Sequence, residues 1–246
     1  MHLERSSDPP SRAGVGPADS VGSSYEVRWF FAGEPPPAVV RAFRSVTPWP
    51  ARPDVSGLEW SPSRTDRYLV FAEDLGIKSR RDPDTPPLFE LKARTADHGD
   101  VSMGPNVQGR AEAWVKWSYD MRRVPHELAA VVVEGIGSVG VQKARILRLV
   151  RLVEGAPPEE VAHDERVPRG IQLELARVSL LQRSGASFWT LGVEAFPADA
   201  GVAAQVLPVV GSFLVEVARE AALPLPRARS MSYPAWLTRL GDSRGG

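Results

Sequence analysis

In the sequence Leu88-Phe89-Glu90-Leu91-Lys92-Ala93-Arg94, apolar and charged side chains alternate from Phe89 onward. Because successive side chains of a β-strand point to opposite faces, Glu90, Lys92 and Arg94 share one face of this segment. Phe89 and Leu91 share the other. The pattern therefore predicts a strand with one charged face and one apolar face.

The same alternation recurs along most of the chain. It predicts strands at residues 24–31, 66–71, 75–80, 88–94, 112–117, 129–134, 141–149, 171–181 and 188–196. Helices are predicted at residues 36–46 and 198–222, and a further segment spans residues 230–240. So many strands with so few helices favour a mainly β (α+β) fold, in which an antiparallel sheet is closed or strongly curved.

The N-terminal residues differ from the rest of the chain. Residues 1–22 are rich in Ser, Gly, Pro and Asp and offer little apolar surface to bury, so we predict a disordered tail there. Residues 23–246 are long and apolar enough to form a single domain with a substantial core.

Composition excludes several classes of function. With 30 basic and 30 acidic residues the chain has no net charge, which argues against binding to duplex nucleic acid. It has no cysteine, and its four histidines are scattered singly, so neither a thiolate or zinc site nor a Ser-His-Asp constellation is indicated. The first residues lack the apolar run of a signal peptide, and Pro208 interrupts the longest apolar stretch, residues 202–217. We therefore expect a cytoplasmic protein that does not span a membrane.

The charged strand faces allow two interpretations. They can face solvent around an apolar sandwich core, as in a plain interaction module, or they can line the inside of a curved sheet. Lys and Arg outnumber the acids on these faces, and such an excess inside a cleft would require an anion, with or without a metal ion, to offset it. Alternation alone does not decide which face is concave.

Residues 135–140, Gly-Ile-Gly-Ser-Val-Gly, fit the dinucleotide-binding pattern and follow an apolar run. That fingerprint requires a helix and then a second strand ending in an acid. Glu154 follows Gly140 by only fourteen positions, and a strand-like Lys143-Ala144-Arg145 lies between them. A connection between strands is the better interpretation.

The order of the motifs resembles the CYTH, or triphosphate tunnel metalloenzyme, superfamily, which includes thiamine triphosphatases, inorganic triphosphatases and class IV adenylyl cyclases. Residues 24–28, Ser-Tyr-Glu-Val-Arg, are similar to the family's opening Glu-x-Glu-x-Lys, and residues 66–69, Asp-Arg-Tyr-Leu, to its Asp-x-Tyr-Leu strand. Similar counterparts follow in order at residues 77–80, 90–94, 112–116, 143–145, 171–174, 192–194 and 232–237.

The resemblance implies an eight-stranded antiparallel tunnel barrel with the charged faces turned inward. It implies a phosphate clamp of basic residues, namely Arg28, Lys78, Arg80, Lys92, Arg94, Lys116, Lys143 and Arg145. It also implies Mg²⁺ or Mn²⁺ held by Glu26, Glu112 and Glu194, with Glu90 and Glu174 as further candidates. Glu26 and Glu112 are the catalytic candidates. Ser24 and Gly192 depart from the pattern, because the family has metal-binding carboxylates there.

The function that the resemblance implies is a metal-dependent phosphohydrolase or phosphoryl-transfer enzyme acting on inorganic triphosphate, thiamine triphosphate or a nucleoside triphosphate. Positioned cations suit this chemistry, because phosphoryl transfer relies on stabilising charged oxygens. The alternative is a non-catalytic sensor that binds a polyanion or nucleotide on the same fold. Trp114, between Glu112 and Lys116 on the charged face, is a candidate contact for an organic group. The oligomeric state is not predicted.

Overall fold

The structure is a computed structural model, and it describes residues 20–52, 55, 58–82, 85–123, 125, 127, 138–182 and 186–242. Its strands are β1 (Ser20–Ala32), β2 (Arg64–Ala72), β3 (Leu75–Asp82), β4 (Thr85–Gly104), β5 (Val107–Asp120), β6 (Ser138–Arg151), β7 (Glu159–Val161), β8 (Gly170–Leu180) and β9 (Ser187–Phe196). Its longer helices are α1 (Pro37–Ser45), α3 (Ala200–Glu220) and α4 (Tyr233–Asp242). Short 3-10 turns span Met121–Arg123 and Arg227–Arg229.

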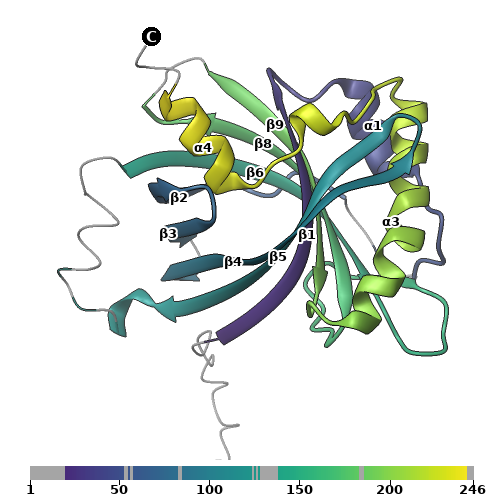
Figure 1. Cartoon of the computed structure of the whole chain (residues 1–246), viewed down its shortest axis with the longest axis horizontal. Coiled ribbons are helices and arrows are strands. Elements are labelled where there is room, and N and C mark those ends of the chain that lie inside the picture. The colour runs from purple at the N-terminus through teal and green to yellow at the C-terminus, as the bar shows by residue number, and fades with distance from the viewer. Residues whose placement is uncertain are drawn as a thin grey trace, which may run out of the picture.

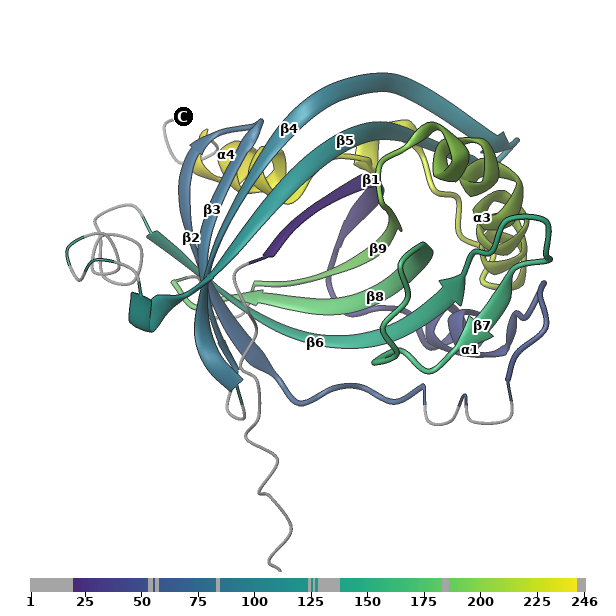
Figure 2. The ribbon, with the colours of Figure 1, turned by 90° about the horizontal axis from the view of Figure 1, so that it is seen from below.

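The strands form one antiparallel sheet in the order β2-β3-β4-β5-β1-β9-β8-β6-β7. Additional pairing between β2 and β6 closes the sheet, so eight strands make a barrel and β7 extends it from β6. Figure 2 shows the strands curving around a common interior. The closed antiparallel barrel expected from the sequence is confirmed.

The predicted elements correspond closely to those observed. Each strand predicted within the described residues is present, and so are the predicted helices at α1 and α3. β1 begins at Ser20, a few residues earlier than expected, and β4 continues ten residues past its predicted end at Arg94. The strand predicted at residues 129–134 and the first three residues of the glycine-rich segment lie outside the described residues. Gly140, which ends that segment, is part of β6.

Apolar side chains on the outside of the barrel form the larger core. The outward faces of β1, β8 and β9 contribute Trp29, Leu173 and Leu191, which are almost fully buried. They pack in one cluster with Phe43 of α1 and Phe213 of α3. Both helices therefore cover the outer surface of the sheet on the side that Figure 1 shows at the right.

α3 is the only described helix that is long and apolar enough to cross a membrane, with a mean hydropathy of 1.7 over its best window. Its buried side chains, among them Val210 and Leu214, belong to the outer core of the barrel. Pro208 lies within the helix and does not end it. The helix thus has a packing role that accounts for its apolar composition.

A second apolar cluster fills one end of the barrel. Phe30 and Val178 alternate with the outward-facing residues and so point inward, and Trp236 and Leu237 of α4 pack against them. The Phe30 and Trp236 rings stack with centroids 4.7 Å apart. α4 and this apolar cluster occupy one end of the barrel interior, and the polar part of the interior lies beside α4.

Candidate functional site

The barrel encloses a cavity of about 220 Å³ beside α4, which we call the tunnel cavity. The lining residues come from all eight barrel strands and from the start of α4. They are Glu26, Arg28, Arg64, Tyr68, Gly76, Lys78, Arg80, Glu90, Lys92, Trp114, Lys116, Lys143, Arg145, Gln172, Glu174, Glu194, Ser232, Tyr233 and Pro234. The charged strand faces are therefore turned inward, which decides between the two interpretations of the sequence.

Cations outnumber acids in this wall. Eight cationic side chains and four carboxylates line the tunnel cavity, and Asp66, fully buried behind the wall, adds a fifth carboxylate. The formal excess is three positive charges among the described residues. All four lysines of the chain are in this wall, and arginine supplies every other Lys or Arg position of the sequence.

Arg28 and Glu174 form a buried ion pair in the wall. Nη1 of Arg28 lies 2.5 Å from Oε1 of Glu174 and donates to the Thr190 hydroxyl at 3.0 Å. Arg145 approaches the second oxygen of Glu174 at 3.4 Å. Burial opposes ionisation of Glu174, but the nearby guanidinium groups of Arg28 and Arg145 outweigh it and hold its pKa well below the ordinary value.

Asp66 forms ion pairs with three cations of the wall. Its carboxylate lies 3.2 Å from Nζ of Lys78, 3.4 Å from Nζ of Lys143 and 3.2 Å from Nε of Arg64. Burial opposes its ionisation, yet Lys78 and Lys143 lower its pKa far below the ordinary range. Asp66 alone cannot neutralise three cations, and Lys78 has Glu90 as a second partner.

Lys143 is the most enclosed of the cations. It is 4% exposed, donates to the Tyr68 hydroxyl at 2.7 Å and lies 3.6 Å from the centre of the Tyr233 ring. Burial lowers its pKa well below the ordinary value, although Asp66 opposes the shift, and the neighbouring Lys78 adds to it. An anion entering the cavity would favour the protonated ammonium.

Glu90 and Lys116 lie on neighbouring strands. Lys78 pairs with Glu90 at 2.8 Å. Burial raises the pKa of Glu90, but Lys78 and Lys116 outweigh it and lower the pKa to about 2. Lys116 itself forms no ion pair with a described residue, so its charge is available to a ligand.

Glu26 and Lys92 pair directly, and the Ser24 hydroxyl also donates to Glu26 at 2.8 Å. Burial works against the charged form of Glu26, while Lys92 lowers its pKa below the ordinary value. Lys92 lies 5.2 Å from the centre of the Trp114 ring. Trp114 is 1% exposed, and its indole N–H finds no acceptor among the described residues. It contributes to the wall, as expected from its position between charged residues.

Gly192 explains how Arg28 is accommodated. Arg28 and Gly192 are partners between β1 and β9, and Gly192 and Glu174 are partners between β9 and β8. A Cβ at Gly192 would lie 2.5 Å from Cζ of Arg28, closer than packed atoms tolerate. The guanidinium therefore crosses the strand where a side chain would otherwise stand.

The structure brings most of the predicted site residues together. Nine of those predicted from the resemblance to bind phosphate or metal line the tunnel cavity: Glu26, Arg28, Lys78, Arg80, Lys92, Lys116, Lys143, Arg145 and Glu194. The further candidates Glu90 and Glu174 also line it.

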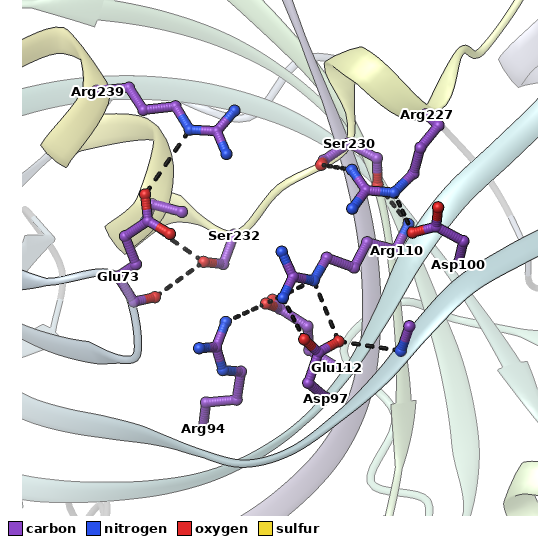
Figure 3. A network of polar contacts seen from close by, with 12 residues as sticks. Glu73, Arg94, Asp97, Asp100, Arg110, Glu112, Arg227, Ser230, Ser232 and Arg239 are labelled. Atoms are coloured by element: carbon purple, nitrogen blue, oxygen red, sulfur yellow. Dashed lines mark hydrogen bonds and ion pairs between the residues drawn. The ribbon is translucent and has the colours of Figure 1, made fainter.

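Arg94 and Glu112 are the exceptions. They pair with each other at 2.7 Å in a network with Asp97 and Arg110, next to the segment that leads into α4 (Figure 3). The β4–β5 pairing shifts register between Arg94 and Ala96, which is typical of a β-bulge that bends a hairpin. These two side chains consequently lie outside the cavity lining, contrary to expectation.

The carboxylates do not fit a preformed metal site. Glu112, Glu26 and Glu194 are register partners on β5, β1 and β9, but Glu112 is bound by Arg94 and Glu26 by Lys92. Among the described residues no three His, Asp or Glu side chains gather closely enough to hold a metal ion. Mg²⁺ or Mn²⁺ binding, implied by the resemblance, finds no assembled donor set here.

Several residues of the wall were not among the predicted site residues. Arg64 precedes the predicted start of its strand, although its spacing to Asp66 and Tyr68 follows the same alternation that identified the others. Ser232 and Tyr233 belong to residues 232–237, which resemble a motif of the tunnel family, but they were not among the predicted site residues. They reach the wall because the segment that leads into α4 folds back onto the barrel.

Comparison with known proteins finds similarity among the solved structures. No model of a protein family and no curated protein matches the chain. A search of the solved structures finds, with others, the RNA triphosphatase Pct1 of S. pombe, which is 13% identical over 83% of this chain and 86% of that chain, with a TM-score of 0.37.

Proposed function

We propose that this protein binds a triphosphate-bearing small molecule, or inorganic triphosphate, inside the barrel. The observation that carries the proposal is the charge imbalance of the tunnel cavity, where eight cationic side chains face four carboxylates. Like charges held together in a partly desolvated space are unfavourable, and a ligand with several negative charges relieves that repulsion.

The kinds of cation support a phosphate ligand. Arg28, Arg64, Arg80 and Arg145 present guanidinium groups whose planar donors match phosphate oxygens, and the lysines add compact charges. The cavity is somewhat smaller than most small-molecule pockets, which span about 300–1,000 Å³, and this favours a compact ligand or the phosphate end of a larger one.

Thermal unfolding in the presence of candidate ligands tests the proposal. We expect inorganic triphosphate, thiamine triphosphate or a nucleoside triphosphate to raise the unfolding temperature, because a ligand at 100 times its Kd stabilises the folded state by about 2.7 kcal/mol. Sulfate at equal ionic strength is the control. If no triphosphate stabilises the protein, with or without Mg²⁺, the proposal fails.

Lysine labelling tests the location of the ligand. Since the four lysines of the chain all line the tunnel cavity, a bound triphosphate should slow their acylation together. Mass spectrometry of the labelled peptides gives the rate for each lysine. Unchanged acylation of Lys92 and Lys116 at saturating ligand would place the ligand elsewhere.

Hydrolysis of the bound triphosphate is the second candidate function. It is favoured by Glu194, which lines the cavity and forms no ion pair with a described residue. Mg²⁺ is often held by only one or two carboxylates together with substrate phosphates. Phosphate release with Mg²⁺ or Mn²⁺ that is abolished by Glu194→Gln would establish this activity. Binding without turnover would leave the protein as a sensor.

A further inference from the structure

The position of the Arg28 side chain explains why residue 192 is a glycine. Gly192 sits within the regular pairing of β9 with β1 and β8, and it is not among the glycines with positive φ, so the backbone itself does not require glycine. The space that a Cβ would occupy is instead filled by the Arg28 guanidinium, whose Cζ, Nη1 and Nη2 would lie 2.5, 2.7 and 2.7 Å away. Close approach of another group is the usual reason for glycine within a strand.

The guanidinium is held in this place from three sides. Glu174 and Thr190 accept from Nη1 at 2.5 and 3.0 Å, and the centre of the Tyr233 ring lies 5.1 Å from Cζ. Its charge is permanent, because arginine stays protonated at every accessible pH. Nη2 and Nε have no hydrogen-bond partner among the described residues, and the side chain lines the tunnel cavity. Arg28 is thus a fixed cation whose Nη2 and Nε can donate to a ligand.

Of the four carboxylates that line the cavity, only Glu194 forms no ion pair with a described residue, so a divalent ion would find at most one uncommitted carboxylate. Arg28 and Arg145 share Glu174, and Lys92 holds Glu26. A divalent ion that takes a second carboxylate would need to displace these cations from their acids. The wall is thus arranged to present positive charge directly, without an intervening metal ion.

We infer that Arg28, lying over Gly192, supplies the fixed positive charge of the site, so that the tunnel cavity binds a polyphosphate with protein cations alone and needs no divalent metal ion. This inference rests on the proposed function. It makes Gly192 a residue that determines specificity, although it contacts the ligand only through Arg28.

Calorimetric titration with inorganic triphosphate tests the metal requirement. The full-length protein is titrated once in excess EDTA and once in excess Mg²⁺. We expect saturable binding in EDTA that is as tight as in Mg²⁺ or tighter, because Mg²⁺ competes with the protein cations for phosphate oxygens. A tenfold or greater gain in affinity on adding Mg²⁺ overturns the inference.

Gly192→Ala tests the place of Arg28. The new Cβ would displace the guanidinium, so we expect at least a tenfold loss of affinity in EDTA. Gly22→Ala is the matched control in β1, because a Cβ there meets no atom within 4 Å. Circular dichroism and unfolding temperature show whether each variant is folded.

A double-mutant cycle separates displacement of Arg28 from general damage to β9. In an Arg28→Lys background the guanidinium is absent, so Gly192→Ala should weaken binding less than twofold further. Equal losses in both backgrounds, or no loss from Gly192→Ala alone, contradict the role of Arg28.

The outcomes distinguish this inference from the proposed function. Triphosphate that binds only with Mg²⁺ refutes the inference and leaves the proposed function standing. Triphosphate that binds under neither condition refutes both.

Discussion

Two buried groups of charges lie on opposite sides of β6 and differ in their balance. On the outer side Arg148 pairs with Glu160 of β7 through two contacts of 2.7 and 2.5 Å, and the side chains are 0% and 1% exposed. Nη1 of Arg148 also donates to the carbonyls of Phe43 and Val46, at the end of α1. Both charges there have partners among the described residues, and neither Arg148 nor Glu160 lines the tunnel cavity.

On the inner side of the same strand, Lys143 and Arg145 belong to a wall in which cations exceed acids by a formal three charges. That wall borders the tunnel cavity. Burial of charge therefore does not by itself mark a binding site. A balanced and fully bonded pair joins elements of the fold, whereas an unbalanced group beside a cavity is suited to a ligand.

The largest effect should come from breaking the balanced pair. Glu160→Gln leaves the Arg148 charge buried without a counterion, and we predict that the free energy of unfolding falls by about 3–5 kcal/mol. Urea denaturation measures it. The exposed pair of Arg44 with Glu59 provides the control, because Glu59→Gln should change stability by less than about 1 kcal/mol.

Affinity for triphosphate should stay within twofold in the folded Glu160→Gln protein, since Arg148 does not line the cavity. A loss of stability below about 1 kcal/mol would show that this pair does not hold α1 and β7 to the barrel.

Lowering the pH should have a smaller effect on the free energy of unfolding, through protonation of Glu90. The pKa of Glu90 is about 2, compared with an ordinary value of 4.5, so the unfolded chain takes up this proton first as pH falls. Ionised Glu90 therefore contributes its full stability above about pH 4.5, and this contribution is lost as the pH falls towards about 2.

Glu90→Gln removes this dependence. Over that pH range we predict that the free energy of unfolding of the wild type falls by roughly 3 kcal/mol more than that of the variant. Urea denaturation at stepped pH provides the comparison. Parallel curves for the two proteins would mean that the tunnel cations do not hold Glu90 ionised.

Removing one of the excess cations of the wall should have the smallest effect on the free energy of unfolding. Lys116→Met removes a cation that has no ion pair with a described residue, so we predict that the free energy of unfolding stays the same or rises by up to about 1 kcal/mol. Affinity for triphosphate should fall about tenfold, as expected for one charged hydrogen bond of about 1.4 kcal/mol. Titration calorimetry and urea denaturation measure the two quantities. A variant that loses stability but keeps its affinity would show that Lys116 serves the fold and not a ligand.

The sequence predicted the barrel because alternation survives in nearly every strand, as in residues 88–94. Alternation also placed Lys78, Lys92, Lys116 and Lys143 on the charged faces of their strands. The resemblance to a tunnel family predicted that these faces point into the barrel. The concentration of all four lysines in these strands was a further signal in the sequence.

The other features of the fold and the site depend on contacts between distant segments, which no local sequence pattern predicts. The role of Arg148 has no local sign in the sequence, because its partner Glu160 lies on β7, a strand of only three residues. Arg94 and Glu112 leave the cavity lining where the long β4–β5 hairpin shifts its register. The roles of Gly192 and Tyr233 become visible only when β9 and α4 are placed against Arg28.

The most direct test of the unbalanced wall is a calorimetric titration of the wild-type protein with inorganic phosphate, pyrophosphate and triphosphate at one ionic strength. We predict one triphosphate bound per chain and an affinity that rises at least tenfold with each added phosphate, because each further charge meets another cation of the wall. Triphosphate that binds no more tightly than inorganic phosphate would contradict the assignment of the tunnel cavity as a polyphosphate site.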